Sequence, residues 1–382
     1  MRILALGGCG QEGKKAVGEM VKLPDLTELV IADLNGEKAL QHAQLHGARA
    51  RGLQLDVMDR PRLLEQMRQA DVVVSFVGPY YRFGQHVLTA AIEAQRNFVD
   101  ICDDPDATVM ELELDDACQT AGISALIGMG CSPGSFNVVA AYGAQYLDVV
   151  HDIELEWCVS VNDIEDTGTS AAMPHVFHII DGEHQQFLNG KLTNVASMSG
   201  RKTVSFPLFG ELETYFVGHP EPITLPRYFK DLRTATNRGC LPGIDDLLRS
   251  FQQAGMTSDV PVGVAGAQVR PRDLAGVLLA NAPLSPAAAS LPPNCGGRII
   301  VRGLKDGRVE ERQYLITAPL NMSPNTGCAA AVGVAMMGRG QITRKGAFAP
   351  EGGVDPNIFM MEMSKIGFTW EETIIRTGSL VI

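Results

Sequence analysis

Short apolar runs alternate with longer amphipathic stretches over the first third of the chain. Runs typical of β-strands lie at 2–7, 28–33, 52–57, 71–77, 97–102 and 123–129, and helix-like stretches lie between them at 12–23, 36–46, 60–69, 84–95 and 107–121. Strand, helix and strand at this spacing predict a parallel sheet with helices on its faces. The run at 71–77 is apolar on both faces, as a sheet covered on both sides requires.

The pattern changes after Pro133. Residues 152–161 and 309–318 alternate apolar and polar positions, which is typical of half-exposed antiparallel strands. Residues 281–297 are rich in proline and predict an exposed loop, and helical character returns at 326–340.

We therefore expect an α/β fold with two domains. The first is a Rossmann-type doubly wound parallel sheet in residues 1–132, completed by residues 320–382. The second, residues 133–319, is an α+β domain that carries a mostly antiparallel sheet and binds the substrate.

A glycine-rich loop follows the first predicted strand. Gly8, Gly10 and Gly13 satisfy G-x-G-x-x-G, with Gln11 inside the motif. The first glycine turns the chain, the second lets the backbone approach a pyrophosphate, and the third lets the helix pack on the sheet. The context of strand, loop and helix favours a bound dinucleotide over a glycine-rich turn without a ligand.

Asp33 ends the second predicted strand, twenty positions after Gly13. A carboxylate there accepts hydrogen bonds from a ribose 2′-hydroxyl and repels a 2′-phosphate. No arginine is adjacent, so we expect NAD as the cofactor, with NADP possible. Asp56, at the end of the third strand, either lies near the adenine or is a carboxylate at a helix N-terminus.

The segment after the fourth strand leaves the carboxyl edge of the sheet, where open α/β sheets bind ligands. Gly78 and Pro79 fix the backbone there, and Tyr80 and Tyr81 supply phenols. We expect the first two to border the cofactor and the tyrosines to border the reacting groups.

Two aspartates follow the fifth strand at the same edge. Asp100 ends an apolar strand, so a role in the reaction is favoured for it. Asp103 could hold a substrate amine, or it could serve with Asp104 as a turn and helix cap.

Two further helices are predicted to start at this edge. Pro133 and Gly134 shape a turn, and Asn137 lies in the first turn of the helix that follows. Thr326 and Gly327 start a tightly packed helix near the C-terminus, which brings Thr326 toward the cofactor and Asn137 toward the substrate.

Composition narrows the function classes. The net charge is −12 and positive and negative residues are mixed along the chain, which argues against a nucleic-acid or membrane partner. The eight cysteines form no C-x-x-C pair, and the N-terminus lacks the apolar region of a secretory leader, so we expect reduced thiols in the cytoplasm.

Taken together, the motif segments resemble the saccharopine dehydrogenase family, in its short form similar to lysine 6-dehydrogenase. The segments that carry the resemblance are 7–16, 75–94, 97–104, 128–148, 174–183, 209–227 and 325–340. The resemblance implies NAD(P)-linked chemistry at an amine carbon and a second domain whose sheet forms a homodimer. It also implies that Gly78 to Tyr81 and Asp100 border the nicotinamide and the substrate. At His178 the family more often has a small polar residue.

Oxidising an amine requires a group that accepts its proton. The candidates are Asp100, Tyr80, His175 and His178. The two histidines are three positions apart on a predicted helix and so share a face, where a structural or capping role is the alternative. No spacing supplies a third metal ligand, so we expect no metal.

A substrate carboxylate would require an arginine fork. Arg201, Arg227, Arg233 and Arg238 are all in the second domain, and the sequence does not choose among them, although we take Arg201 as the first candidate.

Three functions fit these residues. The first is a dehydrogenase that forms or consumes the imine of an amino acid, with a small amino-acid or amine substrate. The second is a reductase of the saccharopine or carboxynorspermidine type, which condenses an amine with a carbonyl compound. The third is a non-catalytic dinucleotide sensor, which would tolerate the loss of the two tyrosines and the aspartate.

Overall fold

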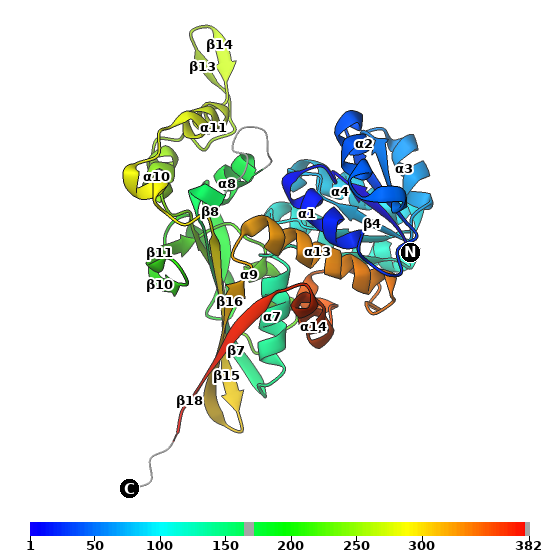
Figure 1. Ribbon diagram of the computed structural model, residues 1–382. Coiled ribbons are helices and arrows are strands. Elements are labelled where there is room, and N and C mark those ends of the chain that lie inside the picture. The colour runs from blue at the N-terminus through cyan, green and yellow to red at the C-terminus, as the bar shows by residue number, and fades with distance from the viewer. Residues whose placement is uncertain (164–171, 379–382) are drawn as a thin grey trace. The chain divides into compact units, whose positions relative to one another are not determined.

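The computed structural model describes residues 1–163 and 172–378 (Figure 1). The chain divides into two compact units. The first consists of Met1–Tyr142 and Ser323–Phe368, and the second consists of Gly143–Met322 and the residues from Thr369 onward.

The first unit is built on a seven-stranded parallel sheet in the order β17-β6-β5-β4-β1-β2-β3. Its strands are β1 (Arg2–Leu6), β2 (Glu28–Asp33), β3 (Ala50–Gln54), β4 (Val72–Ser75), β5 (Asn97–Asp100), β6 (Ser124–Leu126) and β17 (Gly346–Phe348). The predicted parallel, doubly wound sheet is therefore confirmed.

Helices flank this sheet on both faces. The helices of this unit are α1 (Gln11–Met20), α2 (Gly36–Gln44), α3 (Arg60–Arg68), α4 (Tyr80–Ala94), α5 (Pro105–Leu112), α6 (Asp115–Ala121), most of α7 (Ser135–Ala144), α13 (Met322–Gly338) and α14 (Pro356–Lys365). Short 3-10 turns lie at Gly47–Arg49 and Pro350–Gly352. One face of the sheet forms a core with α3, α4 and α5, in which Leu4, Val30, Val73 and Phe98 are buried.

Helix α13, the first helix of the C-terminal part of this unit, crosses α1 closely. A Cβ on Gly327 would lie 2.8 Å from the Ala16 backbone nitrogen and 2.8 Å from the Glu12 backbone oxygen. Glycine is therefore required at this crossing. The helix begins at Met322, a turn earlier than the predicted start at Thr326, which places Thr326 in its second turn.

The last strand corrects the expected domain assignment. Residues 320–382 were all expected to complete the first domain, and β17 does extend its sheet. In contrast, β18 (Thr369–Arg376) pairs antiparallel with β16 (Arg308–Ala318) in the second unit. The boundary after the first segment also lies at Tyr142, ten residues beyond the expected one.

The second unit contains a mixed, mostly antiparallel sheet, as predicted. Its main path is β10-β11-β12-β7-β15-β16-β18, in which only β12 and β7 are parallel, and a β8–β9 hairpin adds to β12. The remaining bounds are β7 (Val149–Val159), β8 (Glu183–Leu188), β9 (Lys191–Ala196), β10 (Lys202–Phe206), β11 (Gly210–Phe216), β12 (Thr234–Cys240) and β15 (Cys295–Lys305).

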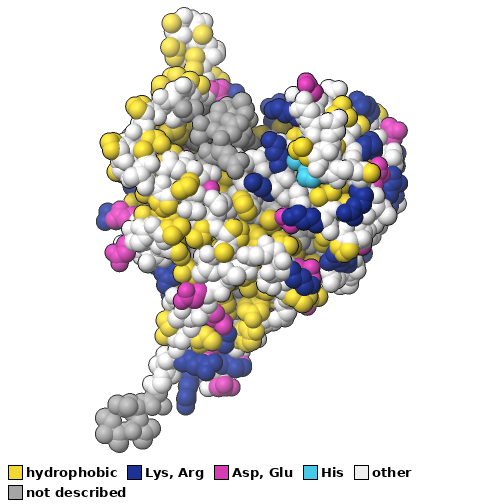
Figure 2. All heavy atoms as spheres, viewed as in Figure 1, with side chains coloured by type: hydrophobic (Ala, Val, Ile, Leu, Met, Phe, Trp, Pro, Cys, Tyr) yellow, Lys and Arg dark blue, Asp and Glu magenta, His cyan; other side chains and the backbone are white. Residues whose placement is uncertain are grey.

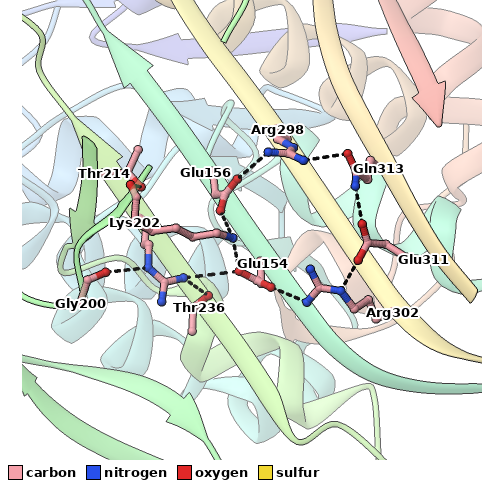
Figure 3. Close-up of polar contacts among 11 residues, drawn as sticks. Glu154, Glu156, Gly200, Lys202, Thr214, Thr236, Arg298, Arg302, Glu311 and Gln313 are labelled. Atoms are coloured by element: carbon pink, nitrogen blue, oxygen red, sulfur yellow. Dashed lines mark hydrogen bonds and ion pairs between the residues drawn. The ribbon is translucent and has the colours of Figure 1, made fainter. Parts of the chain in front are cut away.

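The two faces of this sheet differ in chemistry. Helices α8 (Ala172–Ile180), α10 (Asp245–Gln253) and α11 (Pro271–Asn281) form an apolar core with one face. The other face carries alternating charges that bond across the strands (Figure 3). Lys202 lies 2.6 Å from Glu154 and 2.5 Å from Glu156, whose side chain is fully buried.

Smaller elements complete the second unit. They are the short helices α9 (Glu221–Thr224) and α12 (Pro286–Ala289), 3-10 turns at Val161–Asp163 and Leu225–Arg227, and a hairpin of β13 (Val262–Val264) and β14 (Ala267–Val269). The hairpin exposes Val262 and Val264. Figure 2 shows hydrophobic side chains on the surface of this hairpin. The predicted loop at 281–297 instead contains α12 and the start of β15.

No helix in the described residues is long and apolar enough to cross a lipid bilayer. All eight cysteines are free thiols, and seven of them are buried.

Candidate active site

The glycine loop after β1 leaves no room for a side chain at Gly13. A Cβ on Gly13 would lie 2.6 Å from the Gly7 carbonyl oxygen and 2.9 Å from the Gly8 Cα. Gly7 itself has φ +70°, a conformation that favours glycine. Helix α1 follows with Gly10 as its N-cap and no side chain bonded to its first amides. The loop therefore fits a dinucleotide, whose pyrophosphate would receive those N–H groups.

Helix α13 holds the first turn of α1 in place. The Gln11 side chain donates a hydrogen bond to Ser323 Oγ (2.8 Å), and Ser323 Oγ donates to Glu12 Oε1 (3.2 Å). These bonds direct Gln11 and Glu12 toward α13. Ser323 was not singled out in the sequence, because its partner is more than 300 positions away.

Asp33 lies at the carboxyl end of β2, beside the glycine loop. Its Oδ1 accepts the Asn35 N–H at 3.0 Å, and the Cys9 thiol bonds to the same carboxylate. Burial and the Asp33 charge raise the pKa of Cys9 to about 11, so the thiol keeps its proton. Asp56 is exposed, and its Oδ1 accepts the Met58 N–H at 2.9 Å, which is a turn contact.

The two tyrosines start helix α4, whose N-cap is Pro79. Their backbone amides donate to Asp104 Oδ2, at 3.0 Å from Tyr80 and 3.3 Å from Tyr81. Asp104 therefore supplies the capping acceptor that Pro79 lacks. This aspartate was considered only as a local cap, and the contact with α4 depends on tertiary packing.

Tyr80 and Tyr81 differ in accessibility. The Tyr80 ring is buried, and its hydroxyl donates to the Ser75 carbonyl oxygen at 3.1 Å. Burial, with the nearby Asp100 carboxylate, raises its pKa well above 10. Tyr81 is half-buried, as are Gly78, Pro79 and Asp103.

Asp100 ends β5 and is fully buried. Its Oδ1 accepts two backbone N–H groups, from Cys102 at 3.0 Å and from Gly128 at 2.7 Å. These bonds tie together the loops that follow β5 and β6. Burial raises the pKa of Asp100, and the two amide bonds oppose that shift.

A second carboxyl group lies beside Asp100. Glu111, from α5, is also fully buried and within hydrogen-bonding reach of the Asp100 carboxyl. Burial and the Asp100 charge raise its pKa well above its usual value. Only a weak signal in the sequence indicated Glu111, namely its position four residues after the buried Ala107 on one face of α5.

Two other predicted site residues of this unit, Asn137 and Thr326, lie against other parts of the protein. Asn137 is fully buried, its Oδ1 accepts the Gly134 N–H at 2.9 Å, and its amide donates to Glu351 at 2.9 Å. Thr326 is half-buried, and its methyl group would lie 3.2 Å from a Cβ on Gly130. The amide of Asn137 is thus engaged within the protein.

The remaining predicted residues lie in the second unit. His175 and His178 are both half-buried on α8, and the His175 ring packs edge-on against His219, with the ring centroids 5.8 Å apart. Arg201 is largely exposed and forms an ion pair with Glu213. The assigned functions of these residues stay predictions.

The comparisons with known proteins agree with the fold and the glycine loop. The family described as saccharopine dehydrogenase NADP binding domain matches residues 3–126. A carboxyaminopropylagmatine dehydrogenase from Synechocystis is 24% identical over 96% of both chains. A carboxynorspermidine synthase from Vibrio alginolyticus is 24% identical over 87% of this chain and 84% of its own.

A solved structure shows the same fold over the whole chain. Saccharopine dehydrogenase (L-Glu forming) from Saccharomyces cerevisiae superposes with a TM-score of 0.71, covering 98% of this chain and 99% of its own at 16% identity. The chain is therefore an NAD(P)-dependent oxidoreductase whose residues 3–126 match the NADP-binding domain of the saccharopine dehydrogenase family.

Proposed function

We propose that the protein is a reductase that joins an amine to an amino-acid aldehyde by reducing the imine that they form. The observation that carries this proposal is the similarity to two relatives along most of their length, both named for carboxylated amine compounds. The amine would be a diamine or an agmatine-like compound.

The reaction is balanced without a further reactant. A primary amine condenses with the aldehyde and loses water, and the C=N carbon then accepts a hydride while the nitrogen accepts a proton. Bound NADH or NADPH supplies the hydride. The reverse reaction oxidises the secondary amine.

Acidic residues at the carboxyl edge of the first unit support an amine substrate. Asp103, half-buried in the loop after β5, is the carboxylate that we expect to face a protonated imine. A fixed negative charge stabilises this cation more than it stabilises a neutral imine. Asp100 and Tyr80 are buried, and we now expect them to hold the loops that carry Asp103 and Tyr81.

In the second unit, His175 and His178 are the candidates for delivering the proton to the nitrogen. Histidine suits this role because its usual pKa lies near neutral pH. A substrate carboxylate would bind an arginine. Arg201 remains a candidate, although binding there would have to replace its ion pair with Glu213.

Oxidation of a single amino acid, as in a lysine 6-dehydrogenase, is the second candidate. The resemblance of the segments at 75–94 and 97–104 supports it. This reaction would use the same residues in the opposite direction.

An assay of nicotinamide absorbance separates the two candidates. We expect the purified protein to consume NADH or NADPH when given a diamine or agmatine together with a short amino-acid aldehyde, and not with either alone. Production of NADH from lysine or another single amino acid, without consumption in the paired assay, would contradict the reductase and support the dehydrogenase.

We also propose that the protein acts in the cytoplasm as a homodimer. The eight free thiols are consistent with a reducing compartment. The family resemblance supports a dimer through the sheet of the second unit. Light scattering that gives the mass of one chain at micromolar concentration would contradict the dimer.

A further inference from the structure

Glu111 is a buried carboxyl group that forms no ion pair with a cation of the described residues. Both of its oxygens are inaccessible, and among the described residues the groups that act on it most strongly are Asp100, Cys102 and Asp104. A buried ionised carboxylate without a positive partner is costly, so such groups retain a proton instead.

The Asp100 carboxylate can accept a hydrogen bond from a protonated Glu111 carboxyl group. Asp100 Oδ1 is occupied by the amides of Cys102 and Gly128, whereas no backbone or hydroxyl donor of the described residues reaches Oδ2. The Glu111 carboxyl is within hydrogen-bonding reach of this group. A protonated Glu111 therefore satisfies an oxygen of Asp100 that is otherwise buried without a donor.

Helix α4 makes room for the Glu111 side chain. A Cβ on Gly84 would lie 2.3 Å from Glu111 Oε1. Glycine in a helix interior costs about 1 kcal/mol relative to alanine. The helix thus has a residue of low helix propensity at a position where a Cβ would displace this carboxyl group.

We propose that Glu111 is a positioning residue of the active site. Its protonated carboxyl donates a hydrogen bond to Asp100, and Asp100 in turn holds the loops after β5 and β6 at the cofactor edge of the sheet. The inference rests on the proposed function only for its activity measurement, because its other measurements need no substrate.

The first experiment compares Glu111→Gln, Glu111→Leu and the control Glu113→Gln, which changes an exposed glutamate two positions away. The glutamine amide can replace the donor, whereas leucine leaves the Asp100 oxygen buried without one. We expect Glu111→Leu to lower kcat at least 10-fold with little change in KM, and Glu111→Gln to restore most of it. A Glu111→Leu protein with normal kcat and normal thermal stability would overturn the proposal.

Infrared difference spectra test the proton directly and apply even if Glu111→Leu does not fold. At pH 8 the wild-type protein and Glu113→Gln should show the band of a protonated carboxylic acid that shifts in D2O. The band should be missing from Glu111→Gln. The same band in Glu111→Gln, or no band in the wild type, would overturn the shared proton.

The pH dependence of thermal stability is a further test of the proton on Glu111. The pKa of Glu111 is higher in the folded protein than in the unfolded chain. The stability that its proton provides is therefore complete below the pKa of the unfolded chain, about 4. This stability declines as pH rises toward the pKa of the folded protein. Glutamine does not titrate, so Tm of Glu111→Gln minus Tm of the wild type should rise between pH 5 and pH 8. The other groups facing Glu111, namely Asp100, Cys102, Asp104 and Tyr80, are present in both proteins. A difference that stays flat would contradict the proposal.

A double-mutant cycle with Gly84 tests the geometry. Gly84→Ala should lower Tm in the wild type, because the new methyl group meets Glu111 Oε1. It should be tolerated in Glu111→Ala, where the carboxyl group is absent. Gly18→Ala in α1, where a Cβ meets no atom within 4 Å, is the matched control. Equal Tm losses from Gly84→Ala in both backgrounds would contradict the contact.

Discussion

At the scale of single residues, we expect Asp33 to determine which dinucleotide the first unit prefers. Its carboxylate is fixed by the Asn35 amide and the Cys9 thiol, so it stays at the end of β2 rather than turning away from a ligand. The family description names NADP, and our expectation that NAD binds better stays a prediction. Lys14 and Lys38 lie near enough to influence Cys9, and they would favour a 2′-phosphate once the aspartate is removed.

We therefore predict that Asp33→Ala narrows the affinity gap between NADH and NADPH by about 10-fold or more, which corresponds to about 1.4 kcal/mol. Two changes contribute, since the mutation removes the ribose hydrogen bonds and the repulsion of the phosphate. Fluorescence titration of both cofactors measures the gap. Asp71→Asn, at the amino edge of the same sheet, is the control and should leave the gap unchanged. Tighter NADPH binding by the wild-type protein would show that the expected preference is wrong.

The Tyr80 hydroxyl belongs to the structure of the loop rather than to an accessible surface. We predict that Tyr80→Phe costs about 1 kcal/mol of stability, the usual net value of one hydrogen bond, and lowers kcat less than 10-fold. Urea unfolding and steady-state kinetics measure the two effects. A 100-fold fall in kcat with unchanged stability would instead support the catalytic assignment made from the sequence.

Site residues that the sequence reveals follow a local pattern, whereas those that it hides depend on contacts between distant segments. Gly8, Gly10 and Gly13 are recognisable because a local backbone requirement fixes their spacing. Glu111 and Ser323 are not, because each acts on a partner that only tertiary packing brings near. Asn137 is similar, since its position at a helix start gave no sign that Glu351 would accept a hydrogen bond from its amide, and its role toward a substrate stays a prediction.

At the scale of elements, periodicity located the helices better than it located their ends. The helix expected at 84–95 begins at Tyr80, because Asp104 caps it from another segment. The helix expected at 107–121 is divided into α5 and α6, with the break between Leu112 and Asp115. Helix ends depend on capping groups, which can come from distant parts of the chain.

The charged face of the second sheet predicts the effect of removing one cation. Glu156 is fully buried, and Lys202 at 2.5 Å is its nearest cation, with Arg298 at 3.8 Å (Figure 3). Breaking a buried pair costs about 3–5 kcal/mol. We expect about 2–3 kcal/mol for Lys202→Met, because Lys202 is one-third exposed and Arg298 remains.

Both tryptophans, Trp157 and Trp370, lie in the second unit, so their fluorescence reports its unfolding. The Lys202→Met midpoint in urea should shift clearly toward lower concentration. Lys305→Met removes the cation of an exposed pair with Asp148 in the same unit and should shift the midpoint far less. Equal effects of the two mutations would mean that the charged face does not depend on Lys202.

At the scale of the whole molecule, the chain passes between the two units more often than its sequence pattern indicated. The return of residues 323–368 to the first unit follows from the small, apolar face of α13, which requires a packed partner. The pairing of β18 with the sheet of the second unit could not be predicted in the same way. Its residues are almost all exposed, so they carry no burial pattern that would favour one sheet over the other.

We predict that ending the chain after Phe368 destabilises the second unit and leaves dinucleotide binding intact. Without β18, the edge of β16 is exposed, and three contacts are lost: Arg376 to Glu310 at 2.6 Å, Arg312 to Glu372 at 2.9 Å, and Tyr314 to Glu372 at 2.7 Å. Glu310 is nearly fully buried, and the two arginines hold its pKa below the usual value against burial, so it then relies on Arg312 alone.

Trp157 fluorescence should show unfolding at lower urea, while NADH titration should give an unchanged Kd, because the glycine loop and Asp33 belong to the other unit. Ending the chain after Gly378 is the matched control, since it keeps all of β18. Loss of NADH binding in the shorter protein, with the control intact, would show that the first unit depends on the strand after all.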